Sequence, residues 1–224
     1  MHDYYSQKLS AERLRLCYEI APSRIKQYLE AEIEYVLDKI KSSDFILELG
    51  CGYGRVLKKL AAKAGIVVGI DTSYDSLCFA QQTFSGSLSC YLLEMDAVEL
   101  GFRNKQFDVV VCIQNGIAAF NVNQRKLIQE SMRVTRTGGK ILFSSYSKRF
   151  WMDRLEWFRV QSEYGLIGEI DEKATGGGVI VCKDGFKAST VSPDDFIALT
   201  SNLGIDPVLI EVDGSSIFCE LRIE

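Results

Sequence analysis

A glycine-rich turn between an apolar segment and a helix-like segment is the feature that most constrains the fold of this chain. The apolar run Phe45–Leu49 carries the carboxylate Glu48 near its end, and Gly50, Gly52 and Gly54 follow at alternate positions. Glycine tolerates dihedral angles that other residues avoid, and it lets a ligand lie directly against the backbone. A strand that continues into a helix through such a turn typically forms a cradle for a nucleoside-like cofactor.

Apolar runs and helix-like segments alternate from this turn to about residue 145. Strands are expected at Phe45–Leu49, Ile66–Ile70, Ser89–Glu94, Phe107–Ile113 and Lys140–Ser145, and helices at Tyr53–Ala64, Ser73–Phe84 and Val122–Val134, with a turn at Gly138 and Gly139. Strands that read as continuous apolar runs and alternate with helices indicate a parallel sheet covered on both faces.

Different patterns flank this alternating core. Helices are expected at Ser10–Ile20 and Ser23–Lys41, short strands at Leu166–Asp171, Val179–Lys183 and Gly185–Thr190, a helix from Ser192 to Leu203, and an antiparallel hairpin of Pro207–Val212 and Ser215–Ile223. The length suits a single α/β domain. We divide it into a helical cap (1–44), a cofactor-binding core (45–147), a substrate-side insertion (148–191) and a closing helix and β-hairpin (192–224).

Composition and charge argue against several kinds of partner. The 224 residues are 47% hydrophobic and 25% charged, which is ordinary for a globular protein with a proper core. The net charge of -4 argues against broad binding to a phosphate backbone, so nucleic acid is not an expected partner. No apolar run approaches the roughly 20 residues that span a bilayer, and Met1–Tyr5 lacks the pattern of a signal peptide. We therefore expect a cytoplasmic protein with no membrane partner.

The cysteines and the single histidine limit the available chemistry. The seven cysteines are widely spaced and form no C-x-x-C pair, which predicts reduced thiols in a cytosolic protein. The one histidine, His2, is the second residue of the chain. This excludes an internal histidine base or a histidine-based catalytic triad, and no metal site is expected.

Carboxylates at the ends of three successive strands distinguish among the possible cofactors. Glu48, Asp71 and Asp96 end the first three expected strands, at the sheet edge where open α/β folds bind ligands. A dinucleotide fingerprint needs its third glycine where this chain has Arg55. A carboxylate beside the turn would also repel a pyrophosphate, whereas it attracts a ligand with an ammonium and a sulfonium group. The pattern therefore favours S-adenosylmethionine over NAD or FAD.

In these motifs and their order, the chain resembles the class I S-adenosylmethionine-dependent methyltransferases from Phe45 to Ser147. The resemblance implies a seven-stranded Rossmann-like sheet in the order 3-2-1-4-5-7-6, with strand 7 antiparallel, helices on both faces and a small β-rich insertion near residues 165–190. It also implies S-adenosyl-L-methionine as the cofactor and S-adenosyl-L-homocysteine as the product.

The resemblance assigns the cofactor site residue by residue. The residues implied are Glu48, Gly50, Cys51, Gly52 and Gly54 at the methionine half, Asp71 at the ribose, Thr72, Asp96 and Ala97 at the adenine, and Ile113 and Gln114 beside the cofactor amine and the methyl acceptor.

The methyl acceptor is less constrained. Transfer from a sulfonium mainly requires that the reactants are aligned and water is excluded; a neutral amine needs little more, whereas a hydroxyl benefits from a base. The stretch Cys112–Ile117 is similar to the corresponding part of glycine N-methyltransferase. We therefore expect a small-molecule nucleophile, with nitrogen favoured over oxygen, and no indispensable acid or base. The acceptor-side candidates are Asn115, Tyr5 and Tyr28, together with Tyr4, Arg24, Trp151, Arg154, Trp157 and Arg159.

Other functions stay open at this stage. An RNA or protein methyltransferase could use the cluster of basic and aromatic residues between Phe150 and Arg159. A non-catalytic S-adenosylmethionine-binding module would keep the glycine cradle but lack an acceptor pocket. A nicotinamide-dependent oxidoreductase is a more distant alternative.

Overall fold

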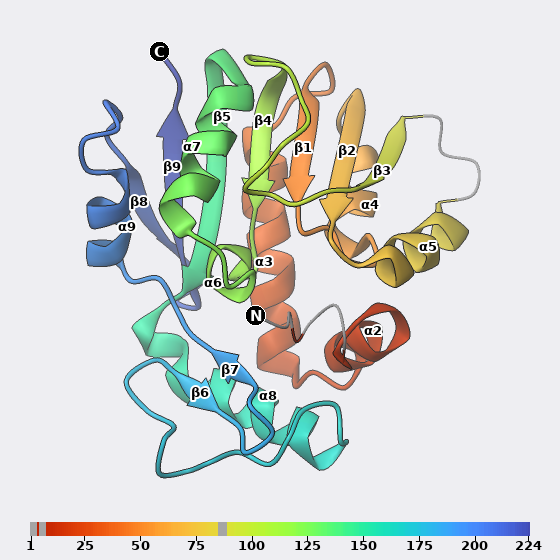
Figure 1. Cartoon of the computed structure of the whole chain (residues 1–224), viewed down its shortest axis with the longest axis vertical. Helices are drawn as coiled ribbons and strands as arrows, with labels where there is room; N and C mark the ends of the chain where they lie inside the picture. The colour runs from red at the N-terminus through yellow and green to blue at the C-terminus, as the bar shows by residue number, and fades with distance from the viewer. Residues whose placement is uncertain (1–3, 5–7, 85–88) are drawn as a thin grey trace.

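A seven-stranded sheet forms the centre of the computed structural model, which describes residue 4 and residues 8–84 and 89–224. Its strands are β1 (Phe45–Leu49), β2 (Ile66–Asp71), β3 (Cys90–Glu94), β4 (Phe107–Cys112), β5 (Thr135–Tyr146), β8 (Val208–Val212) and β9 (Ser216–Arg222). They follow the order β3-β2-β1-β4-β5-β9-β8, and β9 is antiparallel to both neighbours (Figure 1). With the separate β6–β7 pair left out of the numbering, the predicted strand order and directions are confirmed.

Helices cover both faces of the sheet. They are α2 (Ala11–Glu19), α3 (Ser23–Lys39), α4 (Arg55–Ala61), α5 (Tyr74–Thr83), α6 (Gly116–Ala119), α7 (Gln124–Val134), the 3-10 turn η1 (Lys148–Phe150), α8 (Trp151–Glu163) and α9 (Pro193–Thr200). In Figure 1, α7 lies in front of the sheet, and α3 lies behind it. One apolar core joins the sheet to α7 and α9, and a second joins the other face to α3, α4 and α5. None of the helices in the described part of the chain has the length and apolar character needed to cross a membrane.

The central strands are buried because both of their faces are covered. Leu47 pairs in register with Val68 of β2 and Val110 of β4, so these three side chains form an apolar row on one face. Burying an aliphatic side chain of this size stabilises a fold by about 1.5–3 kcal/mol. This two-sided burial explains why the strands read as continuous apolar runs rather than as alternating patterns.

The start of β5 differs from the prediction. The pairing with β4 jumps from Thr135 to Lys140 while β4 advances only from Phe107 to Val109, so the intervening residues bulge out of the ladder. The strand therefore begins at Thr135 and not at Lys140. The expected turn lies inside this bulge, where Gly138 has a φ of 78°.

The amino-terminal helices and residues 148–191 pack together over the carboxyl ends of the parallel strands, at the bottom of Figure 1. The indole Nε1 of Trp157 donates to the carbonyl of Cys17 at 2.9 Å. The guanidinium of Arg13 donates to the carbonyls of Gly165 and Leu166 at 2.8 and 3.1 Å. From here on, the cap means both segments together: the amino-terminal helices and residues 148–191. The two segments share an apolar core of their own.

The cap contains less strand than the sequence predicts. Within residues 148–191, all of which are described, the paired strands are β6 (Ile180–Val181) and β7 (Lys187–Ala188), and the expected strand at 166–171 contributes one isolated bridge. The hydroxyl of Thr175 accepts from the N–H of Val181 and donates to its carbonyl, at 3.1 and 3.3 Å. A side chain thus satisfies backbone groups that a longer ladder would otherwise pair.

The closing helix α9 begins where the sequence places it. Ser192 accepts from the N–H of Asp195 at 3.2 Å, and the Asp195 carboxylate accepts from the N–H of Ser192 at 2.8 Å, which completes a capping box. The helix ends at Thr200 rather than at the predicted Leu203, because Ser201, with a ψ of 136°, has left the helical region and Asn202 has a φ of 61°.

Gly69 lets the turn after β1 pack against β2, and its replacement tests this contact. A Cβ at this position would lie 2.7 Å from Cδ2 of Leu57 and 2.9 Å from Cβ of Cys51. We expect Gly69→Ala to lower the free energy of unfolding by about 1–3 kcal/mol, measured by urea denaturation. Gly101→Ala is the control, since its Cβ would lie 3.5 Å from Cε of Met95. Equal losses in both variants would contradict the packing argument.

Candidate active site

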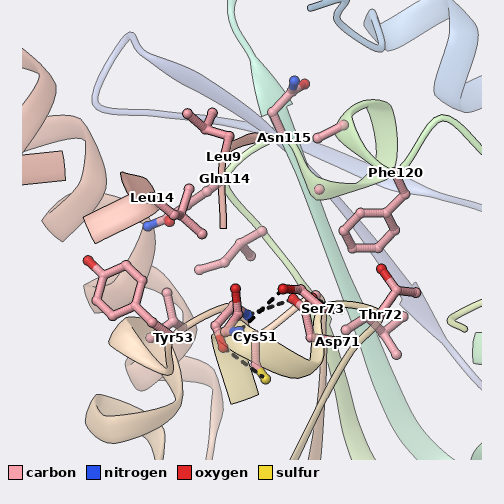
Figure 2. Close-up of a pocket in the computed structure, with 18 of the residues that line it drawn as sticks. Leu9, Leu14, Cys51, Tyr53, Asp71, Thr72, Ser73, Gln114, Asn115 and Phe120 are labelled. Atoms are coloured by element: carbon pink, nitrogen blue, oxygen red, sulfur yellow. Dashed lines mark hydrogen bonds between the residues drawn. The ribbon is translucent and has the colours of Figure 1, made fainter. Parts of the chain in front are cut away.

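A cavity of about 440 Å³ lies at the carboxyl ends of the central strands, between the sheet and the cap. In the view of Figure 2, Cys51 and Asp71 lie at the bottom of the cavity and Asn115 at the top. Tyr53 and Phe120 lie on its opposite sides. The cavity therefore occupies the sheet edge at which the sequence places the cofactor.

Every residue predicted to bind the cofactor lines this cavity except Gly54. Those in its wall are Glu48, Gly50, Cys51, Gly52, Asp71, Thr72, Asp96, Ala97, Ile113 and Gln114. Gly54 has a φ of 85°, and a Cβ there would lie 2.3 Å from Cε2 of Phe84, just beyond α5. Its missing side chain lets α4 begin close to α5, which is a packing role and not exposure to a ligand.

Gly50 and Gly52 present bare backbone to the cavity. Gly50 has a φ of 71°, and a Cβ there would lie 2.4 Å from the ring of Phe120. Gly52 has a φ of 52°, and a Cβ would lie 3.1 Å from Cδ2 of Leu14. A side chain at either position would require a left-handed backbone and would also fill space beside the cavity.

Asp71 connects the end of β2 to the glycine turn. One carboxylate oxygen accepts from the N–H of Gly52 and the other from the N–H of Ser73, both at 2.8 Å (Figure 2). These bonds hold the turn in place and orient the carboxylate toward the cavity wall. An acid in this position can also accept the hydroxyl groups of a ribose.

Glu48 is a buried acid whose charge is poorly compensated. Its side chain is 4% exposed, and Oε2 has no hydrogen-bond partner among the described residues. Burial raises the pKa of Glu48 to about 8, against the opposing effect of the Arg55 guanidinium, and the nearby Asp71 raises the pKa further. A cationic group in the cavity would supply the partner that Oε2 lacks.

The turn after β4 brings two polar side chains into the cavity wall. Gln114 and Asn115 have φ values of 57° and 64°, in the left-handed region that most residues avoid. Oδ1 of Asn115 accepts from the hydroxyl of Ser145 at 2.7 Å, and its Nδ2 donates to the carbonyl of Ser189 at 3.0 Å. These bonds join the turn to β5 and to the cap.

The cap side of the cavity is apolar and aromatic, and most of it was missed from the sequence. The residues that line it there are Leu9, Leu14, Cys17, Tyr18, Tyr146, Trp157, Phe158, Gln161 and Ala188. Gln161 is 3% exposed, and it lines this side of the cavity. Trp157, Phe158 and Gln161 share one face of α8 at three-to-four spacing, which is the sequence signal that could have identified Gln161.

The three leading acceptor candidates differ in whether the structure places them in the cavity wall. Asn115 lines the cavity. Tyr28 does not, because its fully buried ring packs between those of Tyr146 and Phe150, with centroids 5.4 and 5.1 Å away. Tyr5 lies outside the described residues.

Of the other acceptor candidates, only Trp157 lies in the described wall of the cavity. The remaining side chains bond within the fold: Tyr4 donates to Asp184, Arg24 to Asp213, Arg154 to the carbonyls of Gly178 and Ala188, and Arg159 to Glu172, while Trp151 lies beside the Arg154 guanidinium. The sequence offers these arginines and aromatics as candidates for acceptor contact, whereas in the structure they pack and form hydrogen bonds within the cap and at its edges.

The described residues fit S-adenosylmethionine. Glu48 offers an unpaired buried oxygen for an ammonium group, Gly50 and Gly52 offer uncovered backbone, and Asp71 offers a carboxylate for ribose hydroxyls. Asp96 lies in the wall on the side of β3, where Oδ1 accepts from the N–H of Val98 at 2.9 Å.

Comparisons with known proteins match part of this chain to methyltransferases. A family model described as a methyltransferase domain matches residues 46–139. The putative methyltransferase YqeM of Bacillus subtilis is 34% identical over 104 residues, which cover 46% of this chain and 42% of YqeM. The ubiquinone biosynthesis O-methyltransferase of Coxiella burnetii is 25% identical over 145 residues, which cover 62% of this chain and 56% of that protein. The chain thus spans about half the length of these curated relatives.

Solved structures share the fold. A crystal structure of a putative S-adenosylmethionine-dependent methyltransferase from Methanococcus maripaludis superimposes with a TM-score of 0.67 at 14% identity, over 97% of this chain and 94% of that chain. Residues 46–139 of this chain thus match a methyltransferase domain, and the strand order and glycine cradle agree with the fold that the resemblance to class I S-adenosylmethionine-dependent methyltransferases predicts.

The role of Asp71 can be tested by cofactor binding. We expect Asp71→Ala to weaken S-adenosylmethionine binding by about 1–3 kcal/mol, because a ribose contact and the bond to Gly52 are both lost. Isothermal titration calorimetry measures the change. Asp75→Ala, an exposed acid in the first turn of α5, is the control and should leave the affinity unchanged. An unaltered affinity in Asp71→Ala would remove Asp71 from the site.

Glu48→Gln should stabilise the protein and weaken cofactor binding. The folded-state pKa of Glu48, about 8, lies above its ordinary value of 4.5, so folding favours the protonated form. Wild-type stability therefore falls as the pH rises through this window, whereas glutamine cannot ionise. We expect the variant to gain little over wild type at pH 4.5, the ordinary pKa of the carboxyl group, and roughly 1–3 kcal/mol at pH 8, because the gain grows as the pH rises between these values.

Thermal unfolding without ligand at both pH values measures this gain, and calorimetry measures the affinity. A variant that is no more stable than wild type at pH 8, or that binds S-adenosylmethionine as tightly, would contradict the assignment of Glu48.

Proposed function

We propose that this protein transfers the methyl group of S-adenosylmethionine to a small-molecule nucleophile held under the cap. The observation that carries the proposal is the division of one cavity into two parts. Its strand-end side carries carboxylates and bare glycine backbone, and its cap side is aromatic and apolar. Such a division suits a charged nucleoside on one side and a mainly apolar acceptor on the other.

The residues of this chain position the two reactants and exclude water from the cavity. The sulfonium of the bound cofactor supplies an activated methyl group. Glu48, Asp71 and the glycine backbone hold that cofactor against the sheet edge, while Asn115 lies where the strand-end side meets the cap. Trp157 and Phe158 close the cavity from the cap and keep water away from the reacting atoms.

We favour nitrogen over oxygen as the acceptor atom. A hydroxyl needs a base, and burial raises the pKa of Tyr146, whose ring lines the cap side, far above its usual value. A neutral amine reacts without one, and the carboxylates of the wall disfavour an anionic acceptor. The O-methyltransferase relative makes an oxygen acceptor the competing outcome.

The residues between Phe150 and Arg159 do not support an RNA or protein substrate. Arg154, Trp157 and Phe158 are buried, so the cluster seen in the sequence is not a continuous basic and aromatic surface. The cap-side chamber beside Asn115 likewise argues against a binding module that lacks room for an acceptor. We also place the enzyme in the cytosol, which its seven free cysteines support.

The proposal is tested with labelled S-adenosylmethionine and a panel of small amines, phenols and carboxylic acids. We expect label to move to an aromatic or apolar amine. For that acceptor, Gln161→Leu should lower kcat/KM about 10- to 100-fold, because a buried carboxamide that binds it is lost. Binding of S-adenosylmethionine should not change.

Met152→Ala is the matched control, since Met152 lies on the same helix and is 68% exposed. Wild-type protein that binds no S-adenosylmethionine would overturn the proposed function. Transfer to phenols alone would reverse the preference for nitrogen.

A further inference from the structure

A second buried carboxyl group lies behind the cofactor cavity. Glu32 projects from the middle of α3 and is 0% exposed. Its Oε2 accepts from the N–H of Gln114 at 2.6 Å and from the hydroxyl of Ser144 at 2.9 Å. Its Oε1 has no hydrogen-bond partner in the described part of the chain.

Through this contact, Glu32 holds the turn that lines the cavity. The same N–H of Gln114 also points at the hydroxyl of Ser144 at 2.8 Å, so three polar groups meet at one point below the cavity wall. Gln114 adopts a φ of 57°, a conformation that persists only when neighbouring groups enforce it. Its side-chain oxygen accepts from the guanidinium of Arg55, another residue of the wall.

The charge on Glu32 is sensitive to its surroundings. Burial raises the pKa of Glu32 to about 7, against the lowering effects of the hydrogen-bonding groups of Ser144, Gln114 and Ser216 and of the Arg55 guanidinium. The titratable or charged groups that interact with Glu32 are Tyr18 from α2, Tyr28 from α3, Arg55 from α4, Cys112 from β4 and Tyr146 from β5. Arg55 is the cation in this set.

We propose that Glu32 is a positioning residue of the cofactor site, and that its carboxyl group releases a proton to solvent when S-adenosylmethionine binds. The donor carries one net positive charge, whereas S-adenosylhomocysteine is neutral overall. The proton is therefore taken up again once the sulfonium charge has been lost. The preference of the site for the donor S-adenosylmethionine over the product S-adenosylhomocysteine then depends on a carboxyl group that does not line the cavity itself.

The change in charge during methyl transfer explains why coupling cofactor binding to the protonation of Glu32 would favour turnover. Methylation of an amine consumes the sulfonium charge and frees one proton from the nucleophile. A carboxylate that regains a proton at that point no longer attracts a cation. The pocket then distinguishes the cationic donor from the neutral product by charge. The inference rests on the proposed function, because it requires that the cavity binds this cofactor.

Calorimetry at pH 7 in phosphate and in Tris tests the linkage, because the difference in binding enthalpy between these buffers counts the protons exchanged. We expect wild-type protein to release protons on binding S-adenosylmethionine and fewer on binding S-adenosylhomocysteine. Glu32→Gln should release about half a proton less with the donor, since a group with a pKa of about 7 is half protonated at this pH. It keeps an oxygen that can accept from Gln114.

Affinities give a second readout. At pH 8, Glu32→Gln should lower the preference for donor over product by about tenfold, because one buried negative charge is missing. Glu30→Gln is the matched control: it removes the same charge from an exposed position on α3, where Glu30 pairs with Lys59 at 3.5 Å. This control should behave as wild type in both measurements.

A further variant keeps the test decisive if Glu32→Gln does not fold. Ser144→Ala removes a hydrogen bond that lowers the pKa of Glu32, so the pH at which protons are released should move upward. Equal proton release by wild type and Glu32→Gln, or an unmoved pH dependence in Ser144→Ala, would overturn the proposal. Wild-type protein that does not bind S-adenosylmethionine would instead refute the proposed function, so the two failures are distinct.

Discussion

The rest of the site depends on the fastening of the glycine turn to the neighbouring strand β2. The N–H of Cys51 donates to the carbonyl of Ile70 at 2.9 Å, and the N–H of Gly52 donates to the carboxylate of Asp71 at 2.8 Å. Because Gly69 has no side chain, the turn can approach β2 closely enough to form these bonds. The cradle is therefore shaped within the fold itself, and a ligand need not bear the entropic cost of ordering it.

Buried carboxyl groups beside the cavity would favour a cationic ligand, and their ionisation costs stability when no such ligand is bound. Burial raises the pKa of both Glu32 and Glu48, and each has one oxygen without a hydrogen-bond partner in the described part of the chain. Arg55 partly offsets both charges, while its guanidinium stacks on the ring of Tyr18 at 4.6 Å. Strain and uncompensated charge of this kind concentrate where a ligand completes the electrostatics.

The cofactor half and the acceptor half of the cavity come from different parts of the chain. The matched methyltransferase domain covers residues 46–139, whereas Cys17, Tyr146 and Trp157 lie outside it. The bond from Trp157 to the carbonyl of Cys17 joins the two cap segments over the strand ends. Under the proposed function, selection of the acceptor would therefore reside in the cap, outside the matched domain.

The sequence by itself determined the main strands and most of the strand-end wall of the cavity, because strand burial, turn glycines and strand-end acids are local properties of the chain. The order of the strands followed from the family resemblance that these motifs carry, and the structure confirms it. It did not determine the bulge before Lys140, the packing role of Gly54 or the burial of Arg154 and Tyr28. It also did not single out Glu32, which is buried behind the cavity, or Gln161, which lies in its cap-side wall. Only the tertiary structure decided these points, because each depends on segments far apart in the sequence that meet across the carboxyl edge of the sheet and together exclude water.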